Sequence, residues 1–174
     1  VDEGADFRNY TYAKYGRVVL QQPGGYAWQI FDAQTKDLIL SHYKMRGVTK
    51  VVANTLEELV KKMQDVNPVQ FIDTVREYNA AVKREVTFDP NVKDGRCTEG
   101  LAINKSNWAN TIEDGPFEAY QVGCGVSFSF GGVRIDPDSG QVIDSDMNPI
   151  PGLYAAGELV GGIFYHNYPG GTGL

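Results

Sequence analysis

The glycine-rich tail from Pro151 to Leu174 constrains the fold of this chain more than any other stretch. Leu153 to Ala156 form a short apolar run behind a Pro-Gly pair, which predicts a buried strand. Gly157 and Glu158 follow directly, so a carboxylate comes just past the predicted strand end. An open α/β sheet usually meets its ligand at that edge. The tail therefore predicts a ligand-binding loop after a buried strand.

Two pairs of glycines later in the tail support the same interpretation, Gly161-Gly162 and Gly170-Gly171. Glycine lets a backbone approach a ligand closely, because no side chain intervenes. A helix that opens there would direct free N–H groups and its positive dipole end at an electron-rich group. Glycine and proline clusters also mark ordinary turns, so a turn-rich connection between strands is the alternative interpretation.

The size and charge of the chain exclude several classes of protein. Its 174 residues suffice for one domain or two small ones. The net charge of −6 argues against a nucleic-acid or anionic-membrane partner, since such partners need a basic face. No apolar run approaches the roughly 20 residues of a membrane span. Cys97 and Cys124 lack metal-ligand spacing, so we expect a reduced cytoplasmic protein without a metal, with a disulfide as the minor option.

Amphipathic patterns predict helices in the first half of the chain. Tyr10–Gln22 carries apolar residues at helical spacing, and the Pro-Gly-Gly that follows ends it. Thr55 and Glu58 match a capping box at the start of a second helix. Asn67-Pro68 opens a third helix, with proline at the first helical position. We also expect a short helix within residues 33–43. The third helix has an expected buried stripe of Phe71, Ile72, Val75, Tyr78 and Val82.

The remaining pattern is typical of short strands and one long loop. The aromatic and β-branched run Tyr26–Phe31 predicts a strand. Residues 89–110 have no sustained period and predict a long loop, which tends to be functional or to wrap another surface. Asp136–Gly140 has the composition of a turn, so a β-hairpin is expected around it. Further strands are expected at Phe117–Val122, Val126–Ile135, Gln141–Val142 and Leu153–Ala156.

The motif Pro151–Glu158, with Gly161-Gly162 and Gly170-Gly171, resembles the closing FAD-binding segment of the fumarate reductase/succinate dehydrogenase-type flavoproteins. The stretch Gly161–Gly171 is most similar to their tricarballylate dehydrogenase-like branch. The resemblance implies that Glu158, beside Gly157, contacts the flavin ribityl chain. It also implies that the segment Gly170–Thr172 lies against the isoalloxazine ring. The implied cofactor-binding residues are Gly157, Glu158, Gly170, Gly171 and Thr172.

The resemblance also implies an α+β chain in two parts. Residues 1–115 resemble the capping domain, with helices and a small sheet. Residues 116–174 resemble a β-rich partial segment of the FAD-binding α/β domain. The glycine fingerprint that these flavoproteins carry near their N-terminus is absent, because Gly123-x-Gly125-x-x-Phe128 lacks its third glycine. We therefore expect a fragment of a longer flavoprotein, with an incomplete FAD site and the rest of the FAD-binding domain as its partner.

Two positions of this sequence depart from the fumarate reductase pattern. The histidine position of the family's His-His-Thr-Met-Gly-Gly motif holds Phe128, and the arginine position of its Asn-Arg-Leu-Gly-Gly motif holds Tyr168. A phenyl ring cannot hydrogen-bond a carboxylate, and a phenol cannot bind one bidentately as arginine does. These departures argue against simple fumarate or succinate chemistry.

The segment His166–Gly170 is also similar to 3-ketosteroid dehydrogenases, whose tyrosine hydrogen-bonds the substrate carbonyl. The resemblance implies that Tyr168 is an electrophilic donor to a carbonyl. His166 is a candidate base or substrate contact. The alternatives are a core tyrosine beside Pro169 and a structural histidine.

Lys36 occupies, after the strand end Ile30–Asp32, the position of the family's arginine proton donor. A desolvated lysine can move a proton, whereas an exposed helix lysine has no such role. Glu3 and Arg8 resemble the acidic and basic members of the family's proton path, and a solvated charge pair is the alternative.

Two classes of function follow. In the first, the chain is part of an FAD-dependent oxidoreductase that dehydrogenates or reduces a C–C bond beside a carboxylate or carbonyl of a small molecule, with hydride passing to flavin N5. In the second, it is an isolated cap-plus-tail module without activity, which serves only as a structural or interaction fragment.

Overall fold

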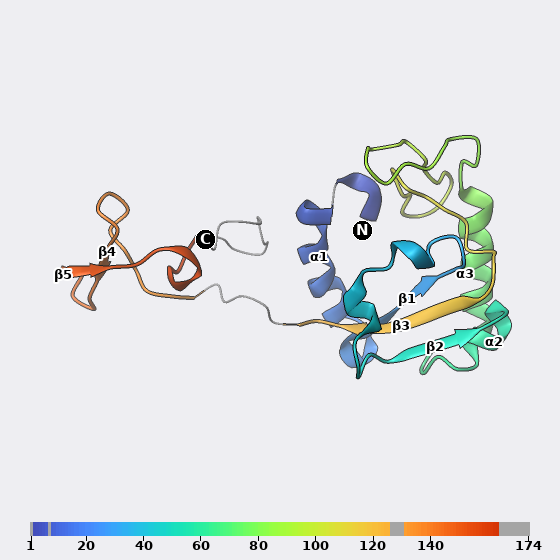
Figure 1. The fold of residues 1–174 in the computed structure, drawn as a ribbon, viewed down its shortest axis with the longest axis horizontal. Coiled ribbons are helices and arrows are strands. Elements are labelled where there is room, and N and C mark those ends of the chain that lie inside the picture. Colours follow the sequence, from blue (N-terminus) through green and yellow to red (C-terminus); the bar gives the residue numbers. More distant parts are fainter. Residues whose placement is uncertain (1, 7, 126–130, 164–174) are drawn as a thin grey trace. The chain divides into compact units, whose positions relative to one another are not determined.

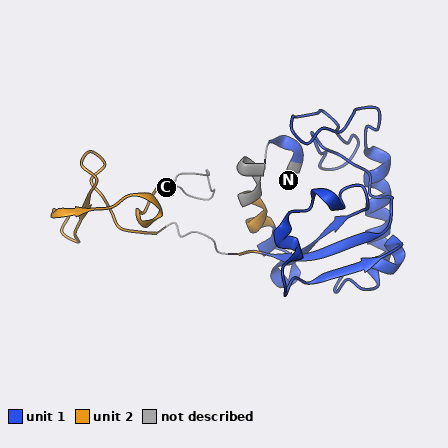
Figure 2. Cartoon of the chain, viewed as in Figure 1, with its two compact units in different colours: residues 1–7, 19–123 blue, residues 8–18, 124–174 orange. Residues whose placement is uncertain are grey.

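The computed structural model describes residues 2–6, 8–125 and 131–163, with the backbone alone for residue 3 and residues 8–13. The chain divides into two compact units (Figure 2). Unit 1 comprises residues 1–7 and 19–123, and unit 2 comprises residues 8–18 and 124–174. Both units mix helix with small antiparallel sheets, as expected for an α+β chain. No helix of the described part is long and apolar enough to cross a membrane.

Unit 1 is built on a three-stranded antiparallel sheet (Figure 1). Its strands are β1 (Tyr26–Phe31), β2 (Lys50–Ala53) and β3 (Phe117–Gly123), in the order β1-β3-β2. The expected strand at Tyr26–Phe31 is confirmed, and β3 extends one residue beyond the expected Phe117–Val122. The expected division of the chain at residue 115 differs from the compact units, because β3 is the central strand of unit 1.

The glycine and proline that suggested this division form the turn into β3. A Cβ on Gly115 would lie 2.4 Å from the Asn54 carbonyl oxygen, so this turn passes directly against the end of β2. The shift in composition at Gly115-Pro116 therefore marks a tight turn within the sheet.

Helices α2 (Leu56–Val60) and α3 (Pro68–Ala81) begin where the capping patterns predicted. Thr55 Oγ1 accepts a hydrogen bond from the Glu58 N–H at 3.2 Å, while the Glu58 carboxylate accepts one from the Asn54 N–H at 3.3 Å. Asn67 Oδ1 accepts hydrogen bonds from two N–H groups of the first turn of α3. Local capping satisfies donors that a helix end leaves open, which explains why these starts were predictable.

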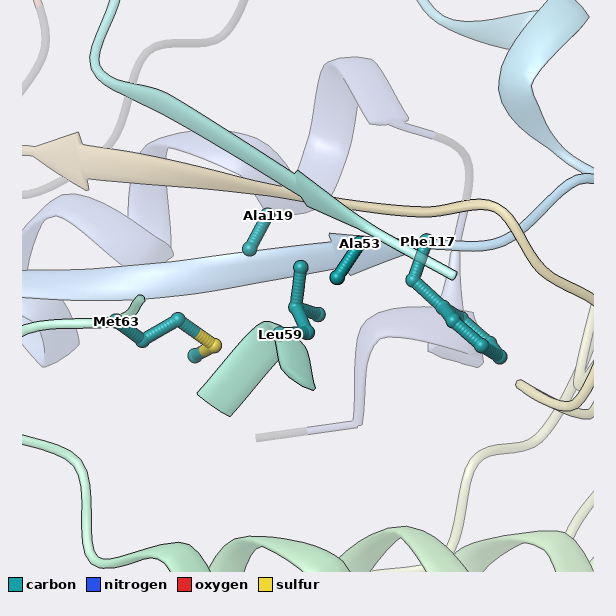
Figure 3. Close-up of a cluster of buried hydrophobic side chains, with 5 residues drawn as sticks. All are labelled: Ala53, Leu59, Met63, Phe117 and Ala119. Carbon is teal, nitrogen blue, oxygen red and sulfur yellow. The ribbon is translucent and has the colours of Figure 1, made fainter. Parts of the chain in front are cut away.

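The hydrophobic core of unit 1 lies between the sheet and α2 (Figure 3). Strand β1 contributes the partly buried Trp28 and Ile30 to the same face. On α3, Val75 is buried and Phe71 packs against the cluster, so part of the expected stripe is confirmed. The buried cluster consists of Ala53, Leu59, Met63, Phe117 and Ala119.

Two irregular segments complete unit 1. The single short helix expected within residues 33–43 is wrong: the chain forms two 3-10 turns, Lys36–Leu38 and Ser41–Lys44. The segment lacks a sustained apolar period, so no amphipathic face selects an α-helix. Residues 89–110 form the expected long loop, in which Thr98 makes an isolated antiparallel bridge to Val82, at the end of α3.

Unit 2 contains most of α1 (Arg8–Leu20) and the hairpin of β4 (Gln141–Ile143) and β5 (Pro149–Tyr154). Helix α1 begins and ends two residues earlier than expected. The expectation of a buried strand at Leu153–Ala156 is wrong: the strand there, β5, ends at Tyr154 and is exposed. Leu153 and Tyr154 are 46% and 63% exposed, because no third layer of described residues covers the two-stranded ribbon.

The turn expected at Asp136–Gly140 is confirmed, with the Gly140 N–H bonded to the Asp136 carbonyl at 2.8 Å. Ile135 and Val142 pair across it as an isolated antiparallel bridge. Of the strand expected at Val126–Ile135, residues 126–130 lie outside the described part, and the remainder forms only isolated bridges.

Candidate functional site

Two glycine-containing segments of unit 2 lie side by side. The Val133 N–H donates to the Leu159 carbonyl at 2.9 Å, and the Gly161 N–H donates to the Val133 carbonyl at 3.0 Å. Val133 and Val160 thereby form a parallel bridge. The structure thus brings Gly132 and Val133 together with the Gly161-Gly162 pair that the sequence singled out.

Only glycine fits at the closest point of this pairing. A Cβ on Gly132 would lie 2.3 Å from the Leu159 carbonyl oxygen and 2.7 Å from the Gly161 nitrogen. A Cβ on Gly161 would lie 2.9 Å from the Gly132 nitrogen. Both contacts are to backbone atoms, which cannot move aside as a flexible side chain can. We therefore define Gly132–Val133 and Leu159–Gly161 as the glycine seam.

Gly157 and Glu158 lie immediately before the glycine seam. They form a 3-10 turn with Leu159 after the end of β5, and Gly157 has φ 72°, a conformation that favours glycine. The Val160 N–H donates to the Gly157 carbonyl at 3.0 Å, which fixes the turn onto the seam. The predicted carboxylate past a strand end is present. The carboxylate of Glu158 can accept hydrogen bonds from hydroxyl groups, so this turn fits a hydroxyl-bearing chain such as the ribityl group of FAD.

The other predicted residues of the tail and the motif before Gly131 lie outside the described part of the chain. They are Phe128, His166, Tyr168, Gly170, Gly171 and Thr172. Lys36 belongs to unit 1, whereas Gly157 and Glu158 belong to unit 2. The candidate catalytic residue Lys36 and the candidate cofactor-binding residues Gly157 and Glu158 therefore belong to different compact units.

Lys36 is exposed and lies in the 3-10 turn Lys36–Leu38, after the end of β1. Its charge acts on Glu118, which belongs to a polar cluster on the sheet face opposite the hydrophobic core. There the Tyr120 hydroxyl donates to Glu118 Oε2 at 2.6 Å, and Lys50 Nζ lies 2.8 Å from Glu118 Oε1. We call Lys50, Glu118 and Tyr120 the sheet triad.

Aromatic side chains enclose the sheet triad. Tyr120 is only 2% exposed, and the Lys50 ammonium lies 5.4 Å from the centre of its ring. The ring of Tyr43 meets that of Tyr120 edge to face at 5.0 Å, while Phe31 does so at 5.8 Å. The Tyr43 hydroxyl donates to Gln29 Oε1 on β1. Segment 41–44 is thereby held onto this face of the sheet.

The sheet triad perturbs the ionisation of all its members. Burial acts to raise the pKa of Glu118, but the hydrogen bonds from Lys50 and Tyr120 and the charges of Lys50 and Lys36 together hold it below its usual value. The hydrogen bond to Glu118 raises the pKa of Lys50. Burial and the hydrogen bond donated to Glu118 raise the pKa of Tyr120. The triad is therefore an ion pair with a neutral phenol at neutral pH.

Sequence reasoning missed the sheet triad, although a signal for it exists. In a strand, alternate residues share a face, so Glu118 and Tyr120 of the expected strand Phe117–Val122 must point the same way. Lys50 could not be found in this manner, because β2 was not predicted. Its register opposite Tyr120 depends on pairing with β3.

Asp32, at the strand end that matched the family pattern, has a structural role. It is 2% exposed, and its carboxylate accepts hydrogen bonds from the N–H groups of Gln34 at 3.0 Å, Glu113 at 3.2 Å and Asp114 at 3.4 Å. A carboxylate buried in this way joins the end of β1 to the segment that leads into β3. Among the described residues, no three His, Cys, Asp or Glu side chains are grouped to hold a metal ion.

Known proteins similar to this chain are flavin-dependent oxidoreductases. A family model described as an FAD binding domain matches residues 2–174. The NADH:fumarate oxidoreductase of Klebsiella pneumoniae (strain 342) is 32% identical over 94% of this chain and 16% of its own length. The 3-oxosteroid 1-dehydrogenase of Mycolicibacterium smegmatis is 32% identical over 84% of this chain and 28% of its own length.

A solved structure gives the same result for the fold. The open conformation of a flavocytochrome c3 fumarate reductase superposes with a TM-score of 0.65 and 29% identity, over 94% of this chain and 26% of that protein. The chain spans less than a third of the length of each of these proteins. The predicted cofactor, FAD, and the predicted fumarate reductase-like flavoprotein family are confirmed. The chain belongs to the FAD-binding domain family that fumarate reductases and 3-oxosteroid dehydrogenases share.

Proposed function

We propose that this chain is part of a larger FAD-dependent oxidoreductase that dehydrogenates or reduces a C–C bond beside a carboxylate or carbonyl of a small molecule. The observation that carries the proposal is the family match over residues 2–174, together with the glycine seam that follows Gly157 and Glu158. FAD, when bound, supplies a hydride acceptor at flavin N5. The chain's own residues must then orient the substrate and move a proton.

In this proposal residues 1–115 act as the capping part over the substrate, with β3 completing their sheet, and the part of residues 116–174 that follows β3 contributes to the flavin site. Glu158 and Gly157 would hold the ribityl chain, with Gly170, Gly171 and Thr172 beside the flavin ring. The rest of the FAD-binding domain would complete the site. The sequence of residues Gly161–Gly171 supports placing the chain in the tricarballylate dehydrogenase-like branch.

Tyr168 is the proposed substrate donor. It stands where the related motif has a carboxylate-binding arginine, and a phenol suits a carbonyl oxygen better than a full carboxylate. A positioned donor stabilises the charge that develops on such an oxygen when the neighbouring carbon loses its proton. His166, two residues earlier, is the proposed base or substrate contact.

Lys36 is exposed in this chain, and we propose that it exchanges a proton on the cap side once the complete flavoprotein desolvates it, with Glu3 and Arg8 as acidic and basic members of a route to solvent. The charge of Lys36 contributes to the lowered pKa of Glu118, which links this lysine electrostatically to the sheet triad. General acid–base catalysis of this kind contributes about 10²- to 10⁴-fold to a rate.

The test uses the complete flavoprotein that carries this chain, with bound FAD. Small saturated carboxylates and ketones are added without oxygen, and bleaching of the flavin absorption reports hydride transfer. We expect Tyr168→Phe to lower the turnover number by about 10²-fold, the scale of losing one such donor. Tyr26→Phe, which removes an exposed hydroxyl of β1 that donates to Asp65, serves as the matched control.

Unchanged turnover in Tyr168→Phe would remove Tyr168 from the mechanism, and the absence of bleaching with every such compound would contradict the substrate class. The 174-residue chain alone is expected to bind FAD weakly, because the glycine fingerprint for the ADP half is absent. Tight stoichiometric binding, with yellow colour that survives desalting, would contradict the incomplete site.

A further inference from the structure

Helices α2 and α3 lie beside one another in unit 1 and border a shallow groove on its surface (Figure 1). The groove has a volume of about 420 Å³. On the side of α3 that faces the core, Phe71 packs against the buried cluster and Val75 is buried. Ile72 is only partly buried and Pro68 is exposed, so apolar surface of α3 is left open at the groove. We define the α2–α3 groove by the residues that line it, Glu57, Val60, Lys61, Pro68, Ile72 and Arg76.

A ridge on α3 borders this groove. Val69 and Asp73 are four positions apart, so their side chains are neighbours on one line of the helix surface. Both residues line the α2–α3 groove, and both also line a second hollow of about 380 Å³ with Gln70 and Thr74. Val69 is 71% exposed, more than any other exposed large apolar side chain of the described residues. We call Val69 and Asp73 the α3 ridge.

The ridge and the groove carry opposite charges. The ridge carries the carboxylate of Asp73, whereas Lys61 and Arg76 give the groove two bases against the one acid Glu57. Within the chain, Arg76 Nη1 lies 3.6 Å from Asp73 Oδ1, and the two side chains are 72% and 57% accessible. An exposed ion pair of this kind contributes little to stability, so both charges remain able to pair with another molecule.

The shape of this surface suits another helix of the same kind. Rows of side chains four positions apart form the ridges through which helices of globular proteins most often pack, at an interaxial angle of about −50°. With two copies of this chain, Val69 of one copy fits between Pro68 and Ile72 of the other, and Asp73 faces Arg76. A twofold axis repeats both contacts, because each copy brings the same ridge and the same groove.

We propose that the α3 ridge and the α2–α3 groove form a self-association surface, and that its partner is a second copy of this chain. A surface with charges of one sign would repel its own copy, whereas this one presents an acid on the ridge and bases in the groove. The surface contains none of the residues proposed for catalysis or flavin binding. The proposal therefore goes beyond the function proposed above and does not depend on it.

The first experiment measures sedimentation velocity of the complete FAD-bound flavoprotein over about a hundredfold range of protein concentration. We expect monomers at the low end and dimers at the high end. Val69→Asp should weaken the dimer by about 100-fold or more, because each dimer would bury the new carboxylate twice in an apolar groove. Val92→Asp is the matched control, since it makes the same change at a valine of the long loop that is 51% exposed.

The second experiment exchanges the charges. Asp73→Arg places two bases opposite one another at each contact of the dimer, and Arg76→Asp places two acids there. Each variant alone should dimerise about tenfold more weakly than the wild type, or worse. An equal mixture of the two variants should recover the wild-type dimer, because each contact of the mixed pair then joins an acid to a base.

Three results would overturn the proposal. A monomer at every concentration would mean that another part of the flavoprotein covers the surface, that a different protein binds it, or that it stays in water. A dimer that Val69→Asp leaves unchanged would place the contact elsewhere on the molecule. An equal mixture that stays as weak as the single variants would reject the pairing of Asp73 with Arg76 of the other copy. None of these results bears on the proposed oxidoreductase function, which is judged by flavin bleaching and by Tyr168→Phe.

Discussion

At the scale of single residues, Glu118 shows how one carboxylate can tie together a sheet and its covering segment. It sits on the central strand, pairs with Lys50 of β2 and accepts the hydroxyl of the buried Tyr120. Tyr120 in turn meets Tyr43 of the covering segment edge to face. The charged pair is only partly exposed, with 36% and 21% of the two side chains accessible, so it is screened less than a surface pair.

The first prediction concerns the pH dependence that Glu118 confers. Its pKa is lower in the folded chain than in the unfolded one, so its ionised form stabilises the fold above the unfolded pKa. This contribution is lost as the pH falls through the folded pKa. We expect the free energy of unfolding, measured by urea at several pH values from about 6 to 3, to fall less steeply in Glu118→Gln than in the wild type. Glu77→Gln, on the exposed side of α3, makes the same change of charge. Equal slopes in Glu118→Gln and the wild type would contradict the role of the triad.

Residue roles were only partly predictable. The pattern Ile30–Asp32 was recognised as a strand end, which is correct, and the carboxylate of Asp32 proves to bind backbone N–H groups of residues 113 and 114. Those donors are about eighty positions away in the sequence, and no local pattern encodes them. Alternation along β3, in contrast, places Glu118 and Tyr120 on one face without any knowledge of the fold.

At the scale of elements, the glycine seam is the feature that shapes unit 2. Two stretches that lack regular secondary structure pair in parallel because neither carries a side chain at the contact. A seam of this kind fixes the turn at Gly157 and Glu158 without a helix or a wide sheet. The turn is then held ready for a ligand, which lowers the entropic cost of binding.

The second prediction is that Gly132→Ala opens the seam. The added Cβ would lie 2.3 Å from the Leu159 carbonyl, so the two backbones must separate. We expect the Val133 and Gly161 amides, both donors in the seam, to exchange with solvent about tenfold faster or more. Gly131→Ala is the matched control, because a Cβ at Gly131 meets no described atom within 4 Å. Equal protection in the two variants would show that the seam does not need glycine at residue 132.

Elements were predictable where their determinants are local. The starts of α2 and α3 were predicted because Thr55 and Asn67 cap helices that begin within three residues of them. Strand β2 was missed because Lys50–Ala53 is a four-residue edge strand whose partner, β3, follows more than sixty residues later. The exposure of β5 could not be predicted either, since an apolar run alone does not indicate whether another layer covers it.

At the scale of the whole molecule, the two compact units differ in what holds them together. Unit 1 has a hydrophobic core between its sheet and α2, buried polar side chains in its long loop, and hydrogen bonds that join Asp2 and Gly4 to Ser106 and Asn107 of that loop. In the described part of unit 2, the only sheet is a two-stranded ribbon, and Leu159 and Tyr154 are both 63% exposed. Two-stranded ribbons are marginally stable by themselves, so we expect unit 2 to be the less stable of the two units in the 174-residue chain.

The third prediction follows from this difference: the 174-residue chain unfolds in two steps. Both tryptophans, Trp28 and Trp108, belong to unit 1, where their indole N–H groups donate to the carbonyls of Gln64 and Asp89. In a urea titration, tryptophan fluorescence therefore reports unit 1, whereas far-ultraviolet circular dichroism reports both units. We expect the fluorescence midpoint to lie at a higher urea concentration than the first change in circular dichroism.

A reporter in unit 2 makes this prediction sharper. Tyr154→Trp places an indole on β5 at an exposed position, so the substitution should perturb the fold little. Its fluorescence change should appear at the lower urea concentration, as a transition that the wild type lacks. In the complete flavoprotein we expect the rest of the FAD-binding domain to pack against β5, so the same reporter should move to the higher transition. A single transition shared by fluorescence and circular dichroism in the 174-residue chain would mean that its two units fold as one, because coincident changes from independent probes are the mark of two-state unfolding.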